Sequence, residues 1–302
     1  MKTPSSLLCG LPNMISMLPE ILVTNPNIHI ATVNQRKSGG TSMSGDLVFE
    51  KYLEEVKPDL CVFLSPYKGM LGDLSLCLEK GLHIITSGPV PHADKSFQQL
   101  VDIVKNNKAR WEIRDDFMLD PYQEKLQQAI EETDFGLLVY YREITFGGPS
   151  LLSNWWRLCQ LYDKAKALFK SEIVETHVSA NRQRNKIQLS LTLKSANRAN
   201  GHIICTNSSY KSDGDLLLIG TGGVMTYEGL HNGPGIFTKR GYQPIPSDPH
   251  LPIMSWWDKI IGEETPASEA LPPPKRMGIH NDILRAIIRS IKDKRIIKIK
   301  PG

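Results

Sequence analysis

The chain has 302 residues, of which 40% are hydrophobic and 23% are charged, and its formal net charge is +4. This length allows two domains with separate cores, and the composition is that of a globular protein. The mild charge does not suggest a nucleic-acid partner, and no apolar run approaches the roughly 18–20 residues of a membrane-spanning helix. Five cysteines without a CxxC pair predict free thiols in a reducing compartment, so we expect a cytoplasmic protein.

The first third of the chain alternates strand and helix patterns. Strands are expected at 6–9, 28–33, 60–64 and 83–86, and helices at 13–24, 47–56, 68–80 and 95–106. The segment 60–64 is apolar throughout, as in a parallel sheet covered on both faces. Strands separated by helices of this length predict an α/β fold with a doubly wound parallel sheet. We place this Rossmann-type, dinucleotide-binding domain at residues 1–114.

From about residue 137 the pattern becomes that of an antiparallel sheet. Strands are expected at 137–142, 173–182, 186–195, 201–209 and 215–221, and helices at 121–132, 151–169 and 281–294. Within 186–195, Ile187, Leu189, Leu191 and Leu193 alternate with other residues, which indicates one covered sheet face. Residues 115–302 are expected to form a C-terminal α+β domain with a mainly antiparallel open sheet, which the helix at 151–169 is suited to cover.

The C-terminal end is basic, because residues 275–302 carry nine lysines and arginines against two aspartates. The solvated face of a terminal helix is the simpler interpretation. Contact with a polyanion or a membrane surface is the alternative.

Several landmarks in sequence order carry a resemblance to known proteins. A strand ends in Ser65-Pro66, a helix ends in Leu-Glu-Lys-Gly at 78–81, a strand starting with His83 precedes Pro89, and glycines cluster at 220–223. This order resembles the glucose–fructose oxidoreductase/inositol dehydrogenase (Gfo/Idh/MocA) family over nearly the whole chain. The resemblance implies a Rossmann domain joined to a sheet domain, hydride transfer between NAD or NADP and a small polar organic substrate, and a homodimer through the C-terminal sheet.

The positions that would hold the cofactor depart from the family pattern. A Rossmann fingerprint needs three glycines after the first strand, and residues 8–13 retain only Gly10, followed by Pro12 and Asn13. Free N–H groups of a helix starting there could still bind phosphate; an ordinary strand–helix turn is the alternative. The residues after the second strand favour NADP over NAD, unless they belong to a solvated loop: Gln35, Arg36 and Lys37. By resemblance, further cofactor contacts are expected at Ser65, Pro66, Ser87, Gly88 and Pro89.

The catalytic positions depart further. The family has Glu-Lys-Pro where this chain has Ser87-Gly88-Pro89, so the proton-donating lysine falls on glycine. The family's Asp and His, one helical turn apart, fall near Ser153 and Arg157. Arg157 can bind a carboxylate or phosphate but does not exchange protons near neutral pH. His92 is the nearest titratable imidazole and our candidate for the missing proton donor, although a loop histidine can simply be exposed.

Biliverdin reductases share the scaffold and also lack that lysine, and Phe146-Gly-Gly-Pro149 is weakly similar to a stretch in them. Hydride transfer therefore does not require the lysine. Our first hypothesis is a divergent NAD(P)-dependent oxidoreductase. A catalytically inactive relative that senses a ligand or binds a protein is the alternative.

Other candidate groups have structural interpretations. Trp155-Trp156 and Trp256-Trp257 could stack on a planar ligand, but we expect one tryptophan of each pair in the core. Glu112, with two nearby aspartates, is either an acid/base source or part of a charged hinge surface. No histidine spacing is that of a metal site, so no metal is expected.

Overall fold

The computed structural model describes residues 5–10, 24–32, 45–64, 67, 69–90, 94–107, 109–113, 123–146, 150–184, 186–207, 215–228, 232–245 and 274–299. The chain divides into two compact units. The first comprises residues 1–116 and 253–277, and the second comprises residues 117–252 and 278–302.

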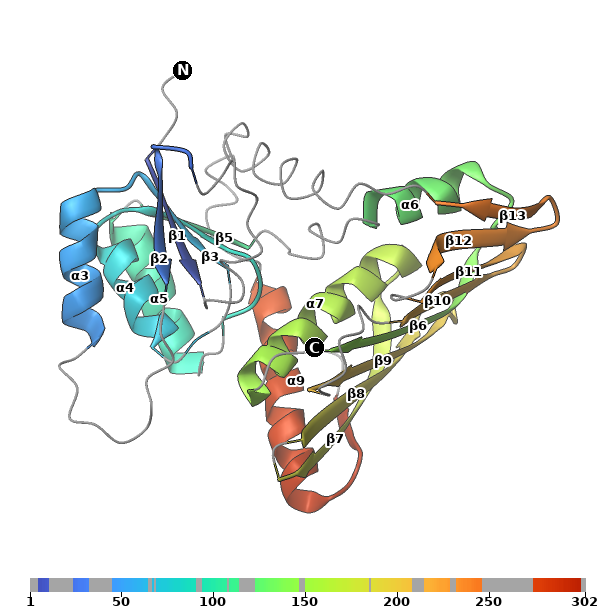
Figure 1. The fold of residues 1–302 in the computed structure, drawn as a ribbon. Coiled ribbons are helices and arrows are strands. Elements are labelled where there is room, and N and C mark those ends of the chain that lie inside the picture. Colours follow the sequence, from blue (N-terminus) through green and yellow to red (C-terminus); the bar gives the residue numbers. More distant parts are fainter. Residues whose placement is uncertain are drawn as a thin grey trace. The chain divides into compact units, whose positions relative to one another are not determined.

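The first unit is built on a five-stranded sheet in which every neighbouring pair is parallel. Its strands are β1 (Ser6–Gly10), β2 (Ile28–Thr32), β3 (Leu60–Phe63), β4 (His83–Thr86) and β5 (Arg110–Ile113), in the spatial order β2-β1-β3-β4-β5. Its helices are α3 (Gly45–Val56), α4 (Met70–Glu79) and α5 (Asp94–Asn107), and α4 lies between the other two (Figure 1). The expected Rossmann-type sheet is confirmed.

Two helix limits in this unit differ from the expected ones. Helix α4 begins at Met70, because the preceding Gly69 has φ 101°, a left-handed conformation outside the helical region. Helix α5 includes Asp94, which the sequence pattern placed at the cap just before the helix. The helix expected at 13–24 lies almost entirely outside the described residues.

The core of the first unit joins the central strands to α4. Leu7, Cys61 and Phe63 are fully buried, as are Leu74 and Leu78 of α4. All four residues of β3 are buried, which explains why its sequence shows no alternation.

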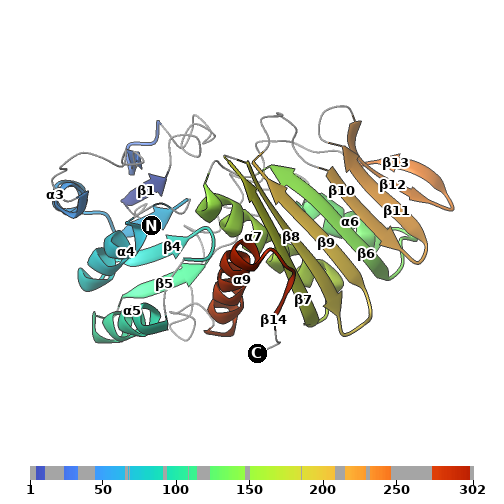
Figure 2. The same cartoon turned by 90° about the horizontal axis from the view of Figure 1, so that it is seen from below.

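The second unit is built on a nine-stranded sheet with the order β13-β12-β11-β10-β6-β9-β8-β7-β14 (Figure 2). Its strands are β6 (Leu138–Phe146), β7 (Ile173–Gln183), β8 (Lys186–Ser195), β9 (Asn200–Thr206), β10 (Asp215–Gly220), β11 (Gly223–Glu228), β12 (Asn232–Thr238), β13 (Gly241–Pro244) and β14 (Ile297–Ile299). Neighbouring strands are antiparallel except β6 and β9, which pair in parallel. The mainly antiparallel sheet is therefore confirmed, with one parallel pair that was not expected.

Three helices belong wholly or largely to this unit: α6 (Gln123–Glu132), α7 (Leu151–Phe169) and α9 (Pro274–Asp293). Helix α9 begins before the expected residue 281. Its first residue is proline, which is favoured at that position because the first N–H groups of a helix have no intrahelical partner.

Helix α7 covers one face of the nine-stranded sheet (Figure 1). The alternating residues Leu189, Leu191 and Leu193 are buried, as expected. Trp155 and Trp156 are both buried, so the core packing expected for one tryptophan of this pair is confirmed and extends to both. The Trp155 indole N–H donates to the backbone oxygen of His280 at 2.9 Å and so links α7 to α9. Trp256 and Trp257 lie outside the described residues.

The glycines at 220–223 form the tight turn between β10 and β11 that the resemblance implied. The Gly222 N–H donates to the Phe135 oxygen at 2.9 Å. A Cβ on Gly220 would overlap the Phe135 oxygen, and one on Gly222 would overlap the Asp134 oxygen. These glycines are therefore explained by close backbone packing against the start of β6.

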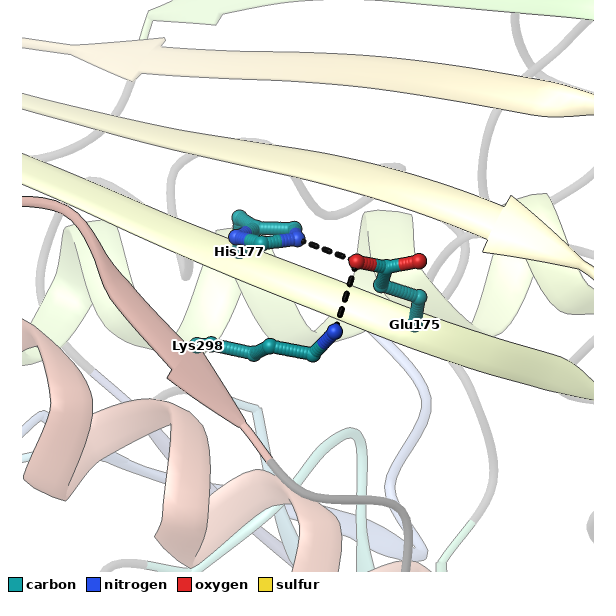
Figure 3. A network of polar contacts seen from close by, with 3 residues as sticks. All are labelled: Glu175, His177 and Lys298. Atoms are coloured by element: carbon teal, nitrogen blue, oxygen red, sulfur yellow. Dashed lines mark hydrogen bonds and ion pairs between the residues drawn. The ribbon is translucent and has the colours of Figure 1, made fainter.

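A small polar network fastens the C-terminal strand to the sheet edge (Figure 3). The Lys298 ammonium of β14 lies 2.7 Å from Glu175 Oε1 of β7, and His177 Nε2 lies 2.8 Å from the same oxygen. The hydrogen bond from Lys298, aided by that from His177, lowers the pKa of Glu175 to about 2.

This network predicts a specific titration. Because its folded-state pKa lies below the ordinary 4.5, Glu175 stabilises the fold above about pH 4.5, and this contribution is lost as the pH falls towards 2. In a Lys298→Met variant, NMR titration should show the pKa of Glu175 rising towards 4.5. Lys294→Met, which changes a nearby exposed lysine, should leave it low. A Glu175 that titrates near 4.5 in the unaltered protein would contradict the network.

Candidate functional site

The carboxyl edge of the five-stranded sheet is where the predicted cofactor residues would gather. Because its strands are parallel, their last residues lie along one edge, from Gly10 of β1 to Phe63 of β3 and Thr86 of β4. Strand β1 pairs with β2 on one side and with β3 on the other, so the chain changes direction across the sheet at β1. Ligands of doubly wound sheets bind outside the carboxyl ends at such a switch point.

The segment after β4 is fully packed. Ser87 is 0% exposed, and Gly88, Pro89 and Val90 are also buried. The Ser87 N–H and hydroxyl both donate to the backbone oxygen of Phe63, at 2.9 and 3.0 Å. Ser87 thus extends the pairing of β4 with β3 by one residue, and its hydroxyl is engaged in a structural hydrogen bond.

Behind this segment, β5 supports the end of β4. The Trp111 indole N–H donates to the Thr86 hydroxyl at 3.3 Å, and that hydroxyl donates to the backbone oxygen of Glu112 at 3.4 Å. Glu112 itself lies within β5, is 6% exposed, and is 2.8 Å from His83 Nε2. The interpretation of Glu112 as part of a hinge surface is therefore wrong.

A buried contact that was not expected from the sequence fixes the connection from β3 to α4. The Tyr67 hydroxyl donates to Asp73 Oδ2 of α4 at 2.6 Å, and both side chains are buried. Burial raises the pKa of the Tyr67 hydroxyl, with the charge of Asp73 among the further causes. This contact anchors the connection that carries the predicted residues Ser65 and Pro66. The only sequence signal is a tyrosine shortly after the strand with an aspartate in the next helix.

The cysteine thiols of β1, β3 and α4 are not suited to act as nucleophiles. Cys9 of β1 is buried, and burial raises its pKa. A hydrogen bond with Cys61, together with burial, raises the pKa of Cys77. Cys9 and Cys77 therefore act as packing residues and not as thiolate nucleophiles. All five cysteines are buried free thiols, as expected.

A cavity of about 310 Å³ lies at the opposite, amino edge of the same sheet, where the chain enters β3 and β4. Its lining includes Leu53, Pro58 and Leu82, with Lys57 and Lys80. None of the predicted cofactor residues lines it.

The remaining predicted site residues in the described part are on α7. Ser150 caps this helix: its hydroxyl accepts from the Ser153 N–H at 3.0 Å, and its own N–H donates to the Ser153 hydroxyl at 3.3 Å. The Ser153 side chain therefore belongs to a capping box.

Arg157 lies one helical turn further on and is partly exposed. It forms no ion pair with any residue in the described ranges. Beneath it, the Cys205 thiol donates to Asn154 Oδ1 at 3.3 Å. Burial raises the pKa of Cys205 to about 12, and the charge of Arg157 opposes this rise.

A buried ion pair lies further along α7, and it was not expected from the sequence. The Lys164 ammonium is 2.9 Å from Glu143 Oε2, and the Tyr141 hydroxyl donates to the same oxygen at 2.6 Å. Lys164 is 1% exposed and Glu143 is 7% exposed. This contact holds α7 against β6. Ser153 and Arg157 lie on the same helix, so the contact also helps to position them.

The structure therefore brings some predicted residues together and leaves others undescribed. Gly10, Ser87, Gly88 and Pro89 share the carboxyl edge of the first unit, and Ser153 and Arg157 share one face of α7 in the second. The following predicted residues lie outside the described ranges: Pro12, Asn13, Gln35, Arg36, Lys37, Ser65, Pro66 and His92.

The described ranges contain neither a metal-binding cluster nor a membrane-spanning helix. No group of three or more His, Cys, Asp and Glu side chains there is placed to hold a metal ion. No helix there combines the length and the apolar character that crossing a membrane requires.

No protein-family model and no curated protein matches the sequence. Solved structures do match the fold. An oxidoreductase from Agrobacterium radiobacter, in complex with NAD+, L-tartaric acid and magnesium, has TM-score 0.67 at 10% identity, with 98% of each chain covered. An NAD-binding oxidoreductase from Klebsiella pneumoniae has TM-score 0.67 at 12% identity, with 100% of each chain covered. A proposed myo-inositol dehydrogenase from Sinorhizobium meliloti 1021 has TM-score 0.63 at 15% identity, covering 98% of this chain and 99% of the other.

This chain has the fold of these oxidoreductases. The likeness extends over both units, so the two-part fold that the family resemblance implied is confirmed. At such low identity the likeness establishes the fold alone.

The buried ion pair predicts a stability difference between two lysines of α7. Lys164→Met should cost about 3–5 kcal/mol, because Glu143 would stay buried without its partner. Lys166→Met, which removes an exposed ion pair with Glu172, should cost less than about 1 kcal/mol. Urea unfolding measures both. Adding Glu143→Gln to Lys164→Met should recover much of the loss, and equal effects of the two single variants would refute the buried pair.

Proposed function

We propose that the protein is a divergent oxidoreductase that uses NAD or NADP to transfer hydride to or from a small polar organic substrate. The observation that carries this proposal is the parallel sheet with its switch point at β1, in a chain whose whole fold is shared with oxidoreductases described as NAD-binding. When bound, the nicotinamide supplies the hydride, so the protein has mainly to bind and orient the reactants.

We place the dinucleotide at the carboxyl edge, where two glycines are among the described residues. Gly10 ends β1 at the switch point, where close approach of a pyrophosphate requires the absence of a side chain. Gly88, after β4, likewise projects no side chain over the edge. Asn13 is the proposed phosphate contact after β1, and Pro12, Ser65, Pro66, Ser87 and Pro89 complete the proposed binding residues.

Selection of NADP is the finer part of this proposal. Gln35, Arg36 and Lys37 follow the second strand, where an acidic residue would bind the ribose hydroxyl of NAD. Two cations there suit the additional phosphate of NADP.

The proton that accompanies hydride transfer needs a source other than lysine. Gly88 has no side chain, the Ser87 hydroxyl donates to the Phe63 backbone oxygen, and the Ser153 hydroxyl accepts from the Ser150 N–H in the capping box of α7. We therefore assign this role to His92 or to solvent. Arg157 is assigned to a carboxylate or phosphate of the substrate, because it has no ion-pair partner in the described ranges.

Cofactor titration tests the proposal. The unaltered protein should bind NADPH roughly tenfold or more tighter than NADH, because charge-assisted contacts to the phosphate are lost with NADH. Arg36→Ala/Lys37→Ala should remove this preference without weakening NADH, whereas Lys51→Ala, which changes an exposed lysine of α3, should preserve it. Nucleotide fluorescence and calorimetry measure both. Absence of binding at millimolar NADPH and NADH would refute the proposal.

A catalytically inactive relative is the second candidate. It is favoured by one specific observation: Ser87 and Ser153 both use their hydroxyls in backbone contacts, at positions where the family that the sequence resembles has proton-exchanging side chains. Tight NADPH binding without oxidation by carbonyl, imine or bilin substrates would support this candidate. Measurable turnover with any of them would remove it.

We also propose a homodimer through the open face of the nine-stranded sheet. Tyr140, Ile219, Val224, Phe237 and Tyr242 are aligned by register across β6 and β10 to β13. The residues that alternate with them face the core, so this apolar row lies on the other face. Phe237 is 49% exposed and Tyr242 is 50% exposed, with ring centroids 4.7 Å apart. A second copy would remove this row from water.

Light scattering tests the dimer. Phe237→Glu places a charge in the apolar row and should convert a dimer into a monomer at micromolar concentration. Ser179→Glu, on the polar part of the same sheet, should remain dimeric. A monomeric unaltered protein, or a dimeric Phe237→Glu variant, would refute this interface.

A reducing, cytoplasmic location completes the proposal. It is supported by the five cysteines, which are all buried and unpaired.

A further inference from the structure

The outward face of the C-terminal half of α9 is both basic and apolar. Helical spacing places Arg285, Ile288, Arg289 and Lys292 within one face, and Ile288 is 53% exposed. The opposite face of the helix packs into the core through residues such as Ile283 and Ile287, each 0% exposed. The outward residues are therefore not needed to hold α9 in place.

The turn between α9 and β14 follows directly in the chain and is also basic and apolar. Lys294, Arg295 and Ile296 are all exposed, and Ile296 is 65% exposed. We call the set Ile288, Arg289, Lys292, Lys294, Arg295 and Ile296 the basic face. Figure 2 shows α9 in red, running beside β14 at the edge of the sheet.

The positive charge of the basic face is only partly compensated. Arg295 lies 3.5 Å from Asp293, and the neighbouring Arg285 lies 3.2 Å from Asp282. Arg289, Lys292 and Lys294 form no ion pair with any residue in the described ranges. All three side chains are exposed, so their charges face solvent.

The two exposed isoleucines, Ile288 and Ile296, favour a lipid surface over a nucleic acid as the anionic partner. Single exposed apolar side chains are ordinary, but here two of the most exposed ones lie among uncompensated cations. That combination is typical of surfaces that enter the interfacial region of an anionic bilayer, where cations meet head groups and aliphatic side chains reach the acyl boundary. Contact with nucleic-acid phosphates would use the cations and leave the isoleucines in water.

We propose that the basic face docks the protein onto an anionic lipid surface. This function is separate from the carboxyl edge of the first unit, and it does not require that edge to bind a nucleotide. It accounts for the charge excess of the C-terminal segment together with the exposure of Ile288 and Ile296.

Vesicle flotation with the full chain tests this proposal. Vesicles of phosphatidylcholine containing about 30% phosphatidylglycerol should bind the protein at about 0.05 M salt, and binding should weaken steeply towards about 0.5 M. Vesicles of phosphatidylcholine alone should not bind it. Arg289→Glu/Lys292→Glu should weaken binding by at least about 30-fold.

Two further variants make the test specific. Lys105→Glu/Lys186→Glu makes the same change in charge at exposed positions elsewhere and should leave most of the binding intact. Ile288→Ser/Ile296→Ser should weaken binding at every salt concentration without changing its salt dependence. Circular dichroism confirms that each variant is folded.

Four outcomes would overturn the proposal. These are no binding to phosphatidylglycerol vesicles, equal losses in the two charge-reversal variants, no effect of the isoleucine substitutions, and release of the protein from vesicles by duplex DNA at matched phosphate concentration. The last result would assign the basic face to nucleic acid.

Discussion

The pairing of β1 with β2 on one side and β3 on the other is the constraint on which the proposed chemistry depends. Parallel strands must enter the sheet at one edge and leave it at the other, so every loop that follows a strand is brought to the same edge. The register of β1 with β3 and of β3 with β4 is continuous, and Ser87 extends it by one further backbone bond to Phe63. Residues far apart in the sequence therefore lie along the same edge of the sheet.

Compared with the family that the sequence resembles, the chain changes side chains while the backbone framework persists. Ser87 and Gly88 stand at positions where a carboxylate and an ammonium would project, yet the segment remains buried and hydrogen-bonded. Ser153 likewise stabilises the start of α7. In the described residues, the proposed site keeps its backbone framework and lacks a proton-exchanging side chain at Ser87, Gly88 and Ser153. Binding and turnover therefore have to be separated in any test of function.

Local patterns were sufficient to predict the kind of sheet in each unit, although β11, β12 and β13 were not expected. The uninterrupted apolar run of β3 and the alternation at Ile187, Leu189 and Leu191 depend only on neighbouring residues, and both indicated the correct kind of sheet. The parallel pairing of β6 with β9 and the three-residue strand β14 could not be predicted this way, because they depend on partners distant in the sequence.

The candidate site was less predictable for the same reason. Lys164 has the sequence context of a solvated helix face, and only its position opposite Glu143 and Tyr141 explains its burial. Tyr67 similarly acquires its role from Asp73 on the next helix. The residues expected to select NADP, Arg36 and Lys37, remain a prediction from the sequence.

A crystal structure of the protein with NADPH is the most direct test of the central claim. The account predicts that the nucleotide lies across the carboxyl edge of the five-stranded sheet, with its pyrophosphate beside Gly10 and its nicotinamide beside Ser87 and Gly88. A nucleotide bound elsewhere, for example in the cavity between Leu53 and Leu82 at the amino edge, would contradict the account.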